Sequence, residues 1–86
     1  MVVKNKVLIQ LFVPMLNERY DIFIPTNERI GAVIKLFAKN LADLTGENIE
    51  KFSNCHILNQ DNATFYEKNQ IVRDTDIKNA TRLMII

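Results

Sequence analysis

One segment, from Pro25 to Gly46, constrains the fold more than any other, because it alone is long and periodic enough to predict a helix. Thr26 or Asn27 is expected to cap its first turn, where Glu28 adds favourable negative charge at the positive end of the helix dipole. Gly46 is expected to end the helix in the left-handed conformation. A single apolar stripe at helical spacing needs a sheet to cover it: Ile30, Val33, Ile34, Phe37, Leu41 and Leu44.

Alternating segments on both sides of the helix predict that sheet. The segments 6–13 and 18–24 are separated by a short turn, which predicts an antiparallel hairpin, and Pro25 ends the second strand because it has no N–H for the ladder. The last segment, 81–86, predicts a strand parallel to the first, reached through a right-handed crossover. The intervening elements are predicted as a loop with a short helical turn at 47–54, a strand at 55–60, a very short strand at 64–66 and a tight or 3₁₀ turn within 70–79.

This order of elements predicts an α+β fold, the ubiquitin-like β-grasp, in which a mixed sheet of four or five strands packs on one α-helix (β-β-α-β-β-β). The rival is a ferredoxin-like arrangement, which would need a second helix between Glu47 and Thr81. That interval lacks helical apolar spacing over three turns. A chain of 86 residues forms one core, so residues 1–86 are predicted to be a single domain.

The charge of the chain excludes some classes of partner. Eleven basic and ten acidic residues give a formal net charge of +1, and neither sign collects in a block, so nucleic-acid binding has no electrostatic support. No apolar run is long enough for direct insertion into a membrane. Cys55 is the only cysteine, which excludes an intramolecular disulfide, and the N-terminal segment lacks the features of a signal peptide. We therefore expect a cytoplasmic protein.

Two segments resemble known families. Residues 70–86, QIVRDTDIKNATRLMII, resemble the end of ubiquitin, with an apolar Val72, an acidic turn at Asp74, Ile77, a polar loop and a final strand that begins at Thr81. Residues 20–34, YDIFIPTNERIGAVI, resemble more closely the YukD-like group of small bacterial ubiquitin-like proteins, in which such a strand runs through a turn into an aliphatic-rich helix.

Members of the YukD-like group are associated with bacterial type VII (WXG100, or Esx-type) secretion systems. The resemblance implies a non-enzymatic protein that assists or regulates assembly of the export machinery through protein contacts. Conjugation and sulfur-carrier chemistry need a flexible tail ending in Gly-Gly, whereas this chain ends at Met84-Ile85-Ile86 and has only two glycines, both far from that end. We therefore expect no conjugation; the alternative is a ubiquitin-like modifier or sulfur carrier whose tail is absent from this sequence.

No group of side chains predicts catalysis, a cofactor or a metal site, so we expect no enzyme. Cys55 and His56 are adjacent on a strand, and their side chains are expected on opposite faces, with the thiol in the core. One cysteine and one histidine do not supply the four ligands of a structural zinc site. Asp74 and Asp76 flank Thr75 in a turn, where capping or solvation explains them at least as well as acid–base chemistry. The chain has no glycine-rich phosphate loop.

The outer face of the sheet is the candidate site. Residues expected to cover the helix are Val7, Ile9, Ile22, Ile24, Ile57, Leu83 and Ile85. The opposite face then carries Leu8, Phe12, Phe23, His56, Leu58, Met84 and Ile86. Contiguous exposed apolar area usually marks an interaction surface, so we expect this face to bind a component of the secretion machinery or a second copy of the chain. The opposing interpretation is that Gln10 and Asp21 interrupt the patch, or that Lys6 and Arg82 cover it.

Overall fold

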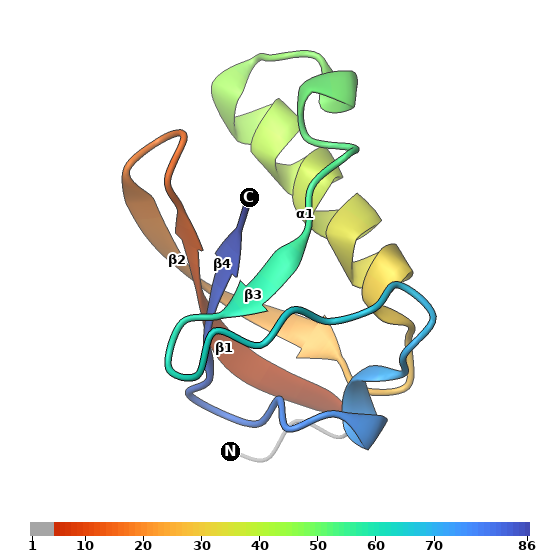
Figure 1. The fold of residues 1–86 in the computed structure, drawn as a ribbon. Coiled ribbons are helices and arrows are strands. Elements are labelled where there is room, and N and C mark those ends of the chain that lie inside the picture. The colour runs from red at the N-terminus through yellow and green to blue at the C-terminus, as the bar shows by residue number, and fades with distance from the viewer. Residues whose placement is uncertain (1–4) are drawn as a thin grey trace.

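A four-stranded sheet carries one long helix across one of its faces (Figure 1). The computed structural model describes residues 5–86, so the first four residues of the predicted domain, and of the segment tested for a signal peptide, lie outside the described part. The predicted α+β β-grasp is confirmed. Its elements are β1 (Lys6–Val13), β2 (Glu18–Pro25), α1 (Ile30–Thr45), the 3₁₀ turn η1 (Ile49–Lys51), β3 (Ile57–Asn59), the 3₁₀ turn η2 (Val72–Asp74) and β4 (Arg82–Ile85).

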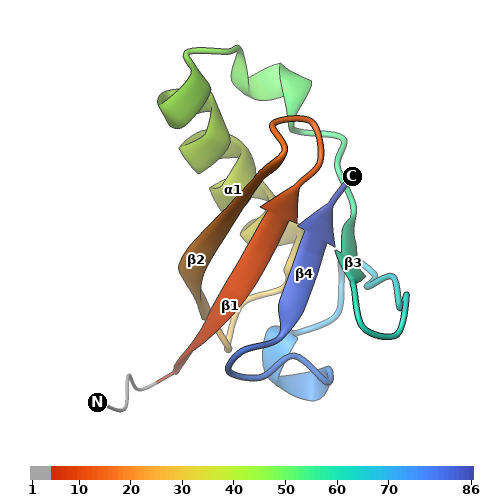
Figure 2. The ribbon, with the colours of Figure 1, turned by 90° about the vertical axis from the view of Figure 1, so that its left-hand side faces the viewer.

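The strands lie in the order β2-β1-β4-β3, and Figure 2 shows the sheet from the side opposite α1. β1 and β2 form the predicted antiparallel hairpin, with Val13 opposite Glu18 next to the turn. β4 lies on the other side of β1 and runs parallel to it, as predicted, with Phe12 opposite Met84. β3 pairs antiparallel with β4 and forms the second edge of the sheet.

The core lies between α1 and the inner face of the sheet. The strands bury alternate residues there, as the pattern predicted: Ile9, Leu11, Val13, Ile24, Ile57, Leu83 and Ile85, with Val7 and Ile22 partly buried. The helix buries Ile30, Val33, Ile34, Phe37, Ala38 and Leu41. The prediction for Leu44 is wrong, because this side chain is 65% exposed. It lies one turn beyond Leu41, on the rim of a cleft between α1 and β2.

The first turn of α1 is held by backbone groups from a distant loop. The N-cap residue is Arg29, whose side chain makes no capping hydrogen bond. Instead the N–H of Ile30 donates to the carbonyl oxygen of Gln70 at 2.8 Å, and the N–H of Gly31 donates to that of Lys68 at 2.9 Å. These bonds satisfy donors that a capping side chain would otherwise satisfy.

The helix boundaries therefore differ from the prediction at one end only. Thr26 and Asn27 precede the N-cap residue Arg29, so the predicted cap is wrong. Glu28 also lies just before the N-cap, and the first turn itself contains no acidic residue. Gly46 ends the helix as predicted: its φ is 72°, and its N–H donates to the carbonyl oxygen of Ala42. Neither α1 nor any other helix of the described residues is long and apolar enough to cross a membrane.

The segments after the helix are mostly irregular, and a polar cluster ties two of them together. The hydroxyl of Tyr66 donates to the Asp76 carboxylate and accepts a hydrogen bond from Nδ2 of the buried Asn59 at 3.2 Å. Asn62 donates to the other oxygen of Asp76 at 3.1 Å. Burial and the bond to Asp76 raise the pKa of Tyr66 to about 12, while the bond from Tyr66 lowers the pKa of Asp76.

Candidate protein-interaction surface

All the residues predicted to form the site lie on the outer face of the sheet. Side chains alternate along a strand, so the neighbours of buried strand residues point away from α1. The exposed members of the predicted set are Leu8, Phe23, His56 and Ile86, and the half-buried members are Phe12, Leu58 and Met84. The register of the strands divides this set into two groups.

The larger group forms a row across three strands and one loop. Met84 on β4 is the partner of both Phe12 on β1 and Leu58 on β3. Phe65 extends the row beyond β3, because it forms a bridge opposite Leu58 and is 57% exposed. Ile86 lies on the same face, two residues beyond Met84. We call these five residues, Phe12, Leu58, Phe65, Met84 and Ile86, the main patch.

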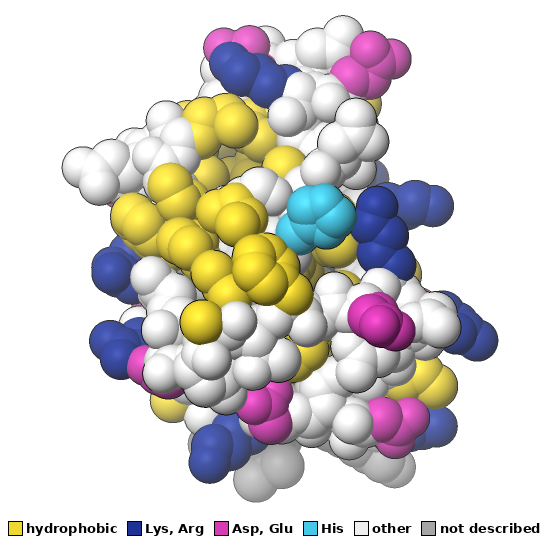
Figure 3. All heavy atoms as spheres, viewed as in Figure 1, with side chains coloured by type: hydrophobic (Ala, Val, Ile, Leu, Met, Phe, Trp, Pro, Cys, Tyr) yellow, Lys and Arg dark blue, Asp and Glu magenta, His cyan; other side chains and the backbone are white. Residues whose placement is uncertain are grey.

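His56 lies at the border of the main patch. Its backbone exchanges two hydrogen bonds with Ile86, of 2.6 and 3.0 Å, which continue the β3–β4 ladder by one residue on each strand. Figure 3 shows hydrophobic side chains gathered beside the histidine, with charged side chains around the gathering and not within it. A continuous apolar area with charges at its margin is the usual anatomy of a protein interface.

The smaller group, Leu8 and Phe23, is separated from the main patch by polar side chains. Leu8 and Phe23 are directly opposite each other on β1 and β2. The next outward residue on β1 is Gln10, which is the partner of Asp21 on β2 and of Arg82 on β4. The interruption that the sequence suggested is therefore present, and it leaves two apolar areas in place of one.

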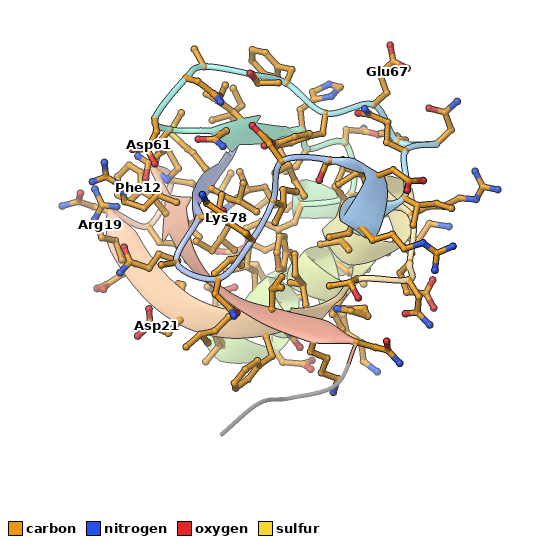
Figure 4. The ribbon with its side chains drawn as sticks, turned by 90° about the horizontal axis from the view of Figure 1, so that it is seen from below. Phe12, Arg19, Asp21, Asp61, Glu67 and Lys78 are labelled. Carbon is orange, nitrogen blue, oxygen red and sulfur yellow. The ribbon has the colours of Figure 1, made fainter. Side chains whose placement is uncertain are left out.

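A single arginine covers part of the main patch. The Arg19 guanidinium lies over the ring of Phe12, 4.7 Å from the ring centroid, and its Nη1 donates to Oε1 of Gln60 at 3.1 Å. Figure 4 shows Phe12, Arg19 and Asp61 together on this side of the sheet. Arg82, which the opposing interpretation places over the face, pairs with Asp61 beside the patch.

Phe65 is the surface residue that the sequence prediction missed. The sequence placed it in a very short strand without a partner, and the structure shows one bridge in that segment and no full strand. Residues directly opposite each other in a sheet share a face, so the bridge to Leu58 turns Phe65 outward. Its neighbour Tyr66 is buried. The signal in the sequence is therefore the alternation of Phe65 and Tyr66, read against the register of β3.

Cys55 and His56 lie as predicted, on opposite sides of the chain. The Cys55 thiol is buried, and burial raises its pKa, which disfavours the nucleophilic thiolate. His56 is exposed. Among residues 5–86 no three His, Cys, Asp or Glu side chains are grouped so that they could hold a metal ion.

No protein-family model and no curated protein matches this sequence. The fold is shared with solved structures. One, described as molecular mimicry of SUMO that promotes DNA repair, has a TM-score of 0.74 and 10% identity, over 99% of this chain and 95% of that one. The ubiquitin-like domain of an Arabidopsis thaliana protein has a TM-score of 0.66 and 6% identity, over 100% of this chain and 81% of that one.

A third similar structure is a chain of an ESX-5 inner membrane complex. Its TM-score is 0.74 at 11% identity, and the match covers 95% of this chain but only 21% of that one. At such low identities these likenesses establish the fold alone. The chain therefore has the fold of ubiquitin-like domains.

Proposed function

We propose that this chain is a non-enzymatic component of a bacterial type VII secretion system, and that it binds a protein of that machinery through the main patch. The observation that carries the proposal is the row of Phe12, Met84, Leu58 and Phe65, which presents contiguous apolar side chains on the side of the sheet opposite α1. The likeness to a chain of the ESX-5 inner membrane complex and the YukD-like pattern of residues 20–34 support the secretion context.

The margin of the patch suits a reversible, noncovalent contact. Met84 lies at its centre, between side chains from β1 and β3, where truncation would remove the most contact area. Arg19 and Arg82 lie at its edge, and arginine is enriched at interfaces because its planar guanidinium both stacks and forms paired hydrogen bonds. A partner with an apolar centre and a carboxylate at its rim fits this arrangement.

The test is a pair of charge substitutions at the centre of the patch. We expect Leu58→Asp with Met84→Asp to abolish recovery of the secretion ATPase and of WXG100-type proteins with the tagged chain, from cells that contain the secretion system. Lys39→Asp, on the exposed side of α1, is the matched control and should leave recovery unchanged. Circular dichroism verifies the fold of each variant. Equal recovery by the folded double variant would contradict the proposal.

A separate measurement tests whether the chain binds its partner noncovalently. We expect the intact mass of the chain from its native cell to equal that of the free polypeptide. An adduct joined to its C-terminal carboxylate would favour the modifier or sulfur-carrier alternative. Sedimentation velocity distinguishes a partner from a second copy, because self-association through this face would disappear in the double variant.

A further inference from the structure

One edge of the sheet is covered by a loop, and the other edge is open. Beyond β3, the following loop returns and covers the edge: the N–H of Asn59 donates to the carbonyl oxygen of Thr64 at 2.9 Å, and the N–H of Tyr66 donates to that of Ile57 at 3.2 Å. Beyond β2 no strand pairs within the described residues, and Figure 2 shows this edge open. An open edge presents unpaired backbone groups that another strand can use.

The hydrogen bonds of β1 show which residues of β2 face that open edge. Leu8 and Gln10 bond toward the β4 side, since the carbonyl oxygen of Leu8 accepts from the N–H of Ala80 at 2.8 Å and the N–H of Gln10 donates to Thr81 at 3.0 Å. The odd-numbered residues of β1 must then form their backbone hydrogen bonds with β2. Their partners on β2 are its even-numbered residues. The odd-numbered residues of β2 therefore point their backbone N–H and C=O groups to the open edge. These residues are Arg19, Asp21 and Phe23.

An apolar cleft of about 320 Å³ lies immediately behind this edge, between β2 and α1. Its walls are Tyr20 and Ile22 from β2, with Phe37, Leu41 and Leu44 from α1 among its other residues. Leu44 lines this cleft and is 65% exposed, because no side chain of residues 5–86 fills the cleft. A strand added to β2 would point alternate side chains into the cleft, in the same direction as Tyr20 and Ile22.

The charges at this place favour a basic partner. The one cation among the three edge residues, Arg19, holds its guanidinium over Phe12 and bonds Gln60, which leaves the acids to dominate. Both charged residues that line the cleft are acids, Asp21 and Asp43. Asp43 lies near the C-terminus of α1, whose last turn has no basic residue, so the negative end of the helix dipole adds to the same potential. A second copy of β2 is disfavoured, because the antiparallel register with the longest overlap of the open residues would place Asp21 opposite Asp21. A segment with lysine or arginine opposite Asp21 would be attracted at the position where a second copy would be repelled.

We propose that an extended segment of a partner protein, with aliphatic residues alternating with lysine or arginine, adds to the open edge of β2 as a fifth strand. Its backbone pairs with Arg19, Asp21 and Phe23, its aliphatic side chains enter the cleft against α1, and a basic side chain lies opposite Asp21. The two surfaces meet only at Arg19, whose backbone lies on the open edge and whose guanidinium lies over Phe12 of the main patch. Strand addition of this kind takes its affinity from main-chain hydrogen bonds and its specificity from the alternate side-chain pockets.

The probe is the peptide acetyl-Val-Lys-Val-Lys-Val-amide, followed by amide nuclear magnetic resonance of the labelled chain. We expect slower hydrogen exchange at the amides of Arg19, Asp21 and Phe23 when the peptide binds, and no change at Tyr20 and Ile22, whose amides already face β1. The acetyl-Val-Glu-Val-Glu-Val-amide peptide has the same alternation with opposite charge and should not bind. Its binding as tightly as the lysine peptide would overturn the proposal.

Asp21→Pro tests the edge directly. Proline is tolerated on an edge strand where its missing N–H faces solvent, so the fold should survive while peptide affinity falls about tenfold or more through the lost hydrogen bond. If that variant does not fold, Leu44→Ser provides the same test from the cleft, because Leu44 is largely exposed and its loss costs the fold little. Leu58→Asp, in the main patch, should leave peptide binding unchanged.

Three further outcomes would refute strand addition at β2. These are peptide-induced shifts centred on Met84 and Leu58, protection that does not alternate along β2, and concentration-dependent protection of the β2 edge without any peptide. The last would assign the edge to self-association. None of these measurements depends on the secretion assay, so failure here leaves the role of the main patch to be judged separately.

Discussion

Removing one hydroxyl, in Tyr66→Phe, should destabilise this chain far more than the loss of one oxygen atom suggests. The hydroxyl of Tyr66 is the shared point of the polar cluster, because it donates to Asp76 and accepts from Asn59. Within the described residues every buried side-chain nitrogen and oxygen has a hydrogen-bond partner. In the variant the buried amide of Asn59 loses its acceptor, and Asp76 loses one of its two side-chain donors and keeps the bond from Asn62.

The magnitude follows from these two losses. Leaving a buried amide without its partner costs about 1 kcal/mol, at the low end of the range for unsatisfied buried groups. The bond to Asp76 involves a charged acceptor, but that carboxylate is exposed, so its contribution is discounted to about 1 kcal/mol as well. The expected decrease in the free energy of unfolding is therefore about 2 kcal/mol, which for a domain of this size corresponds to roughly 10 °C in Tm.

The pH dependence gives the prediction its specific signature. The lowered pKa of Asp76 means that its contribution is present above the ordinary carboxyl pKa and is lost as acid protonates the folded state. The raised pKa of Tyr66 means that its contribution is present below the ordinary value of 10.0 and is lost as the pH rises toward about 12. The difference between wild type and Tyr66→Phe should thus be largest near neutral pH and shrink at both extremes.

Urea unfolding followed by circular dichroism at acid, neutral and alkaline pH measures this profile. Tyr20→Phe is the matched control, because Tyr20 is the other tyrosine of the chain and lies in the open cleft, and it should change the free energy of unfolding by less than about 0.5 kcal/mol. A Tyr66→Phe cost that stays constant from acid to alkaline pH would refute the reasoning, since only packing would then have been lost.

Three further substitutions test other parts of the structure. Gly31→Val should cost about 1–3 kcal/mol in urea unfolding, because a Cβ at this position would already lie 3.3 Å from the carbonyl oxygen of Lys68; an unchanged midpoint would show that the loop yields freely. Gly46→Ala should cost about 1 kcal/mol through its φ of 72° alone, since the added Cβ meets open space; a cost near zero would contradict the strain. Arg19→Ala should change stability by less than about 1 kcal/mol yet raise the fluorescence of the dye ANS, because Phe12 is uncovered; unchanged dye binding would show that Arg19 does not shield the patch.

The sequence was sufficient for the parts of the fold that depend on periodicity. The alternation in β1 and β2 and the stripe on α1 identified the sheet, the helix and the buried face. The start of α1 could not be read in this way, because Ile30 and Gly31 donate to carbonyls about forty positions further along the chain. Capping signals in the local sequence do not predict hydrogen bonds between the helix and a distant loop. The prediction that Leu44 is buried was wrong for a related reason. Helical spacing gives the direction of a side chain but does not tell where the opposing sheet ends.

The candidate surface was predictable in composition but not in layout. Strand alternation placed every predicted residue on the outer face, whereas the division into two areas depends on which residues stand opposite Gln10. The position of Arg19 over Phe12 is a cross-strand contact, and the contribution of Phe65 depends on its bridge to Leu58. Each of these three facts requires the register between strands, which hydrophobic periodicity within one strand does not contain.

The place of β4 within the sheet has a consequence for how the chain folds during synthesis. β4 is the last strand in sequence, yet it lies between β1, with which it runs parallel, and β3. Until its residues have left the ribosome, β3 has no strand beside it, and the β1–β2 hairpin can cover only part of α1. Folding of the sheet must therefore wait for β4, and these non-local pairings slow it further. Meanwhile the apolar inner face of the hairpin is available to chaperones.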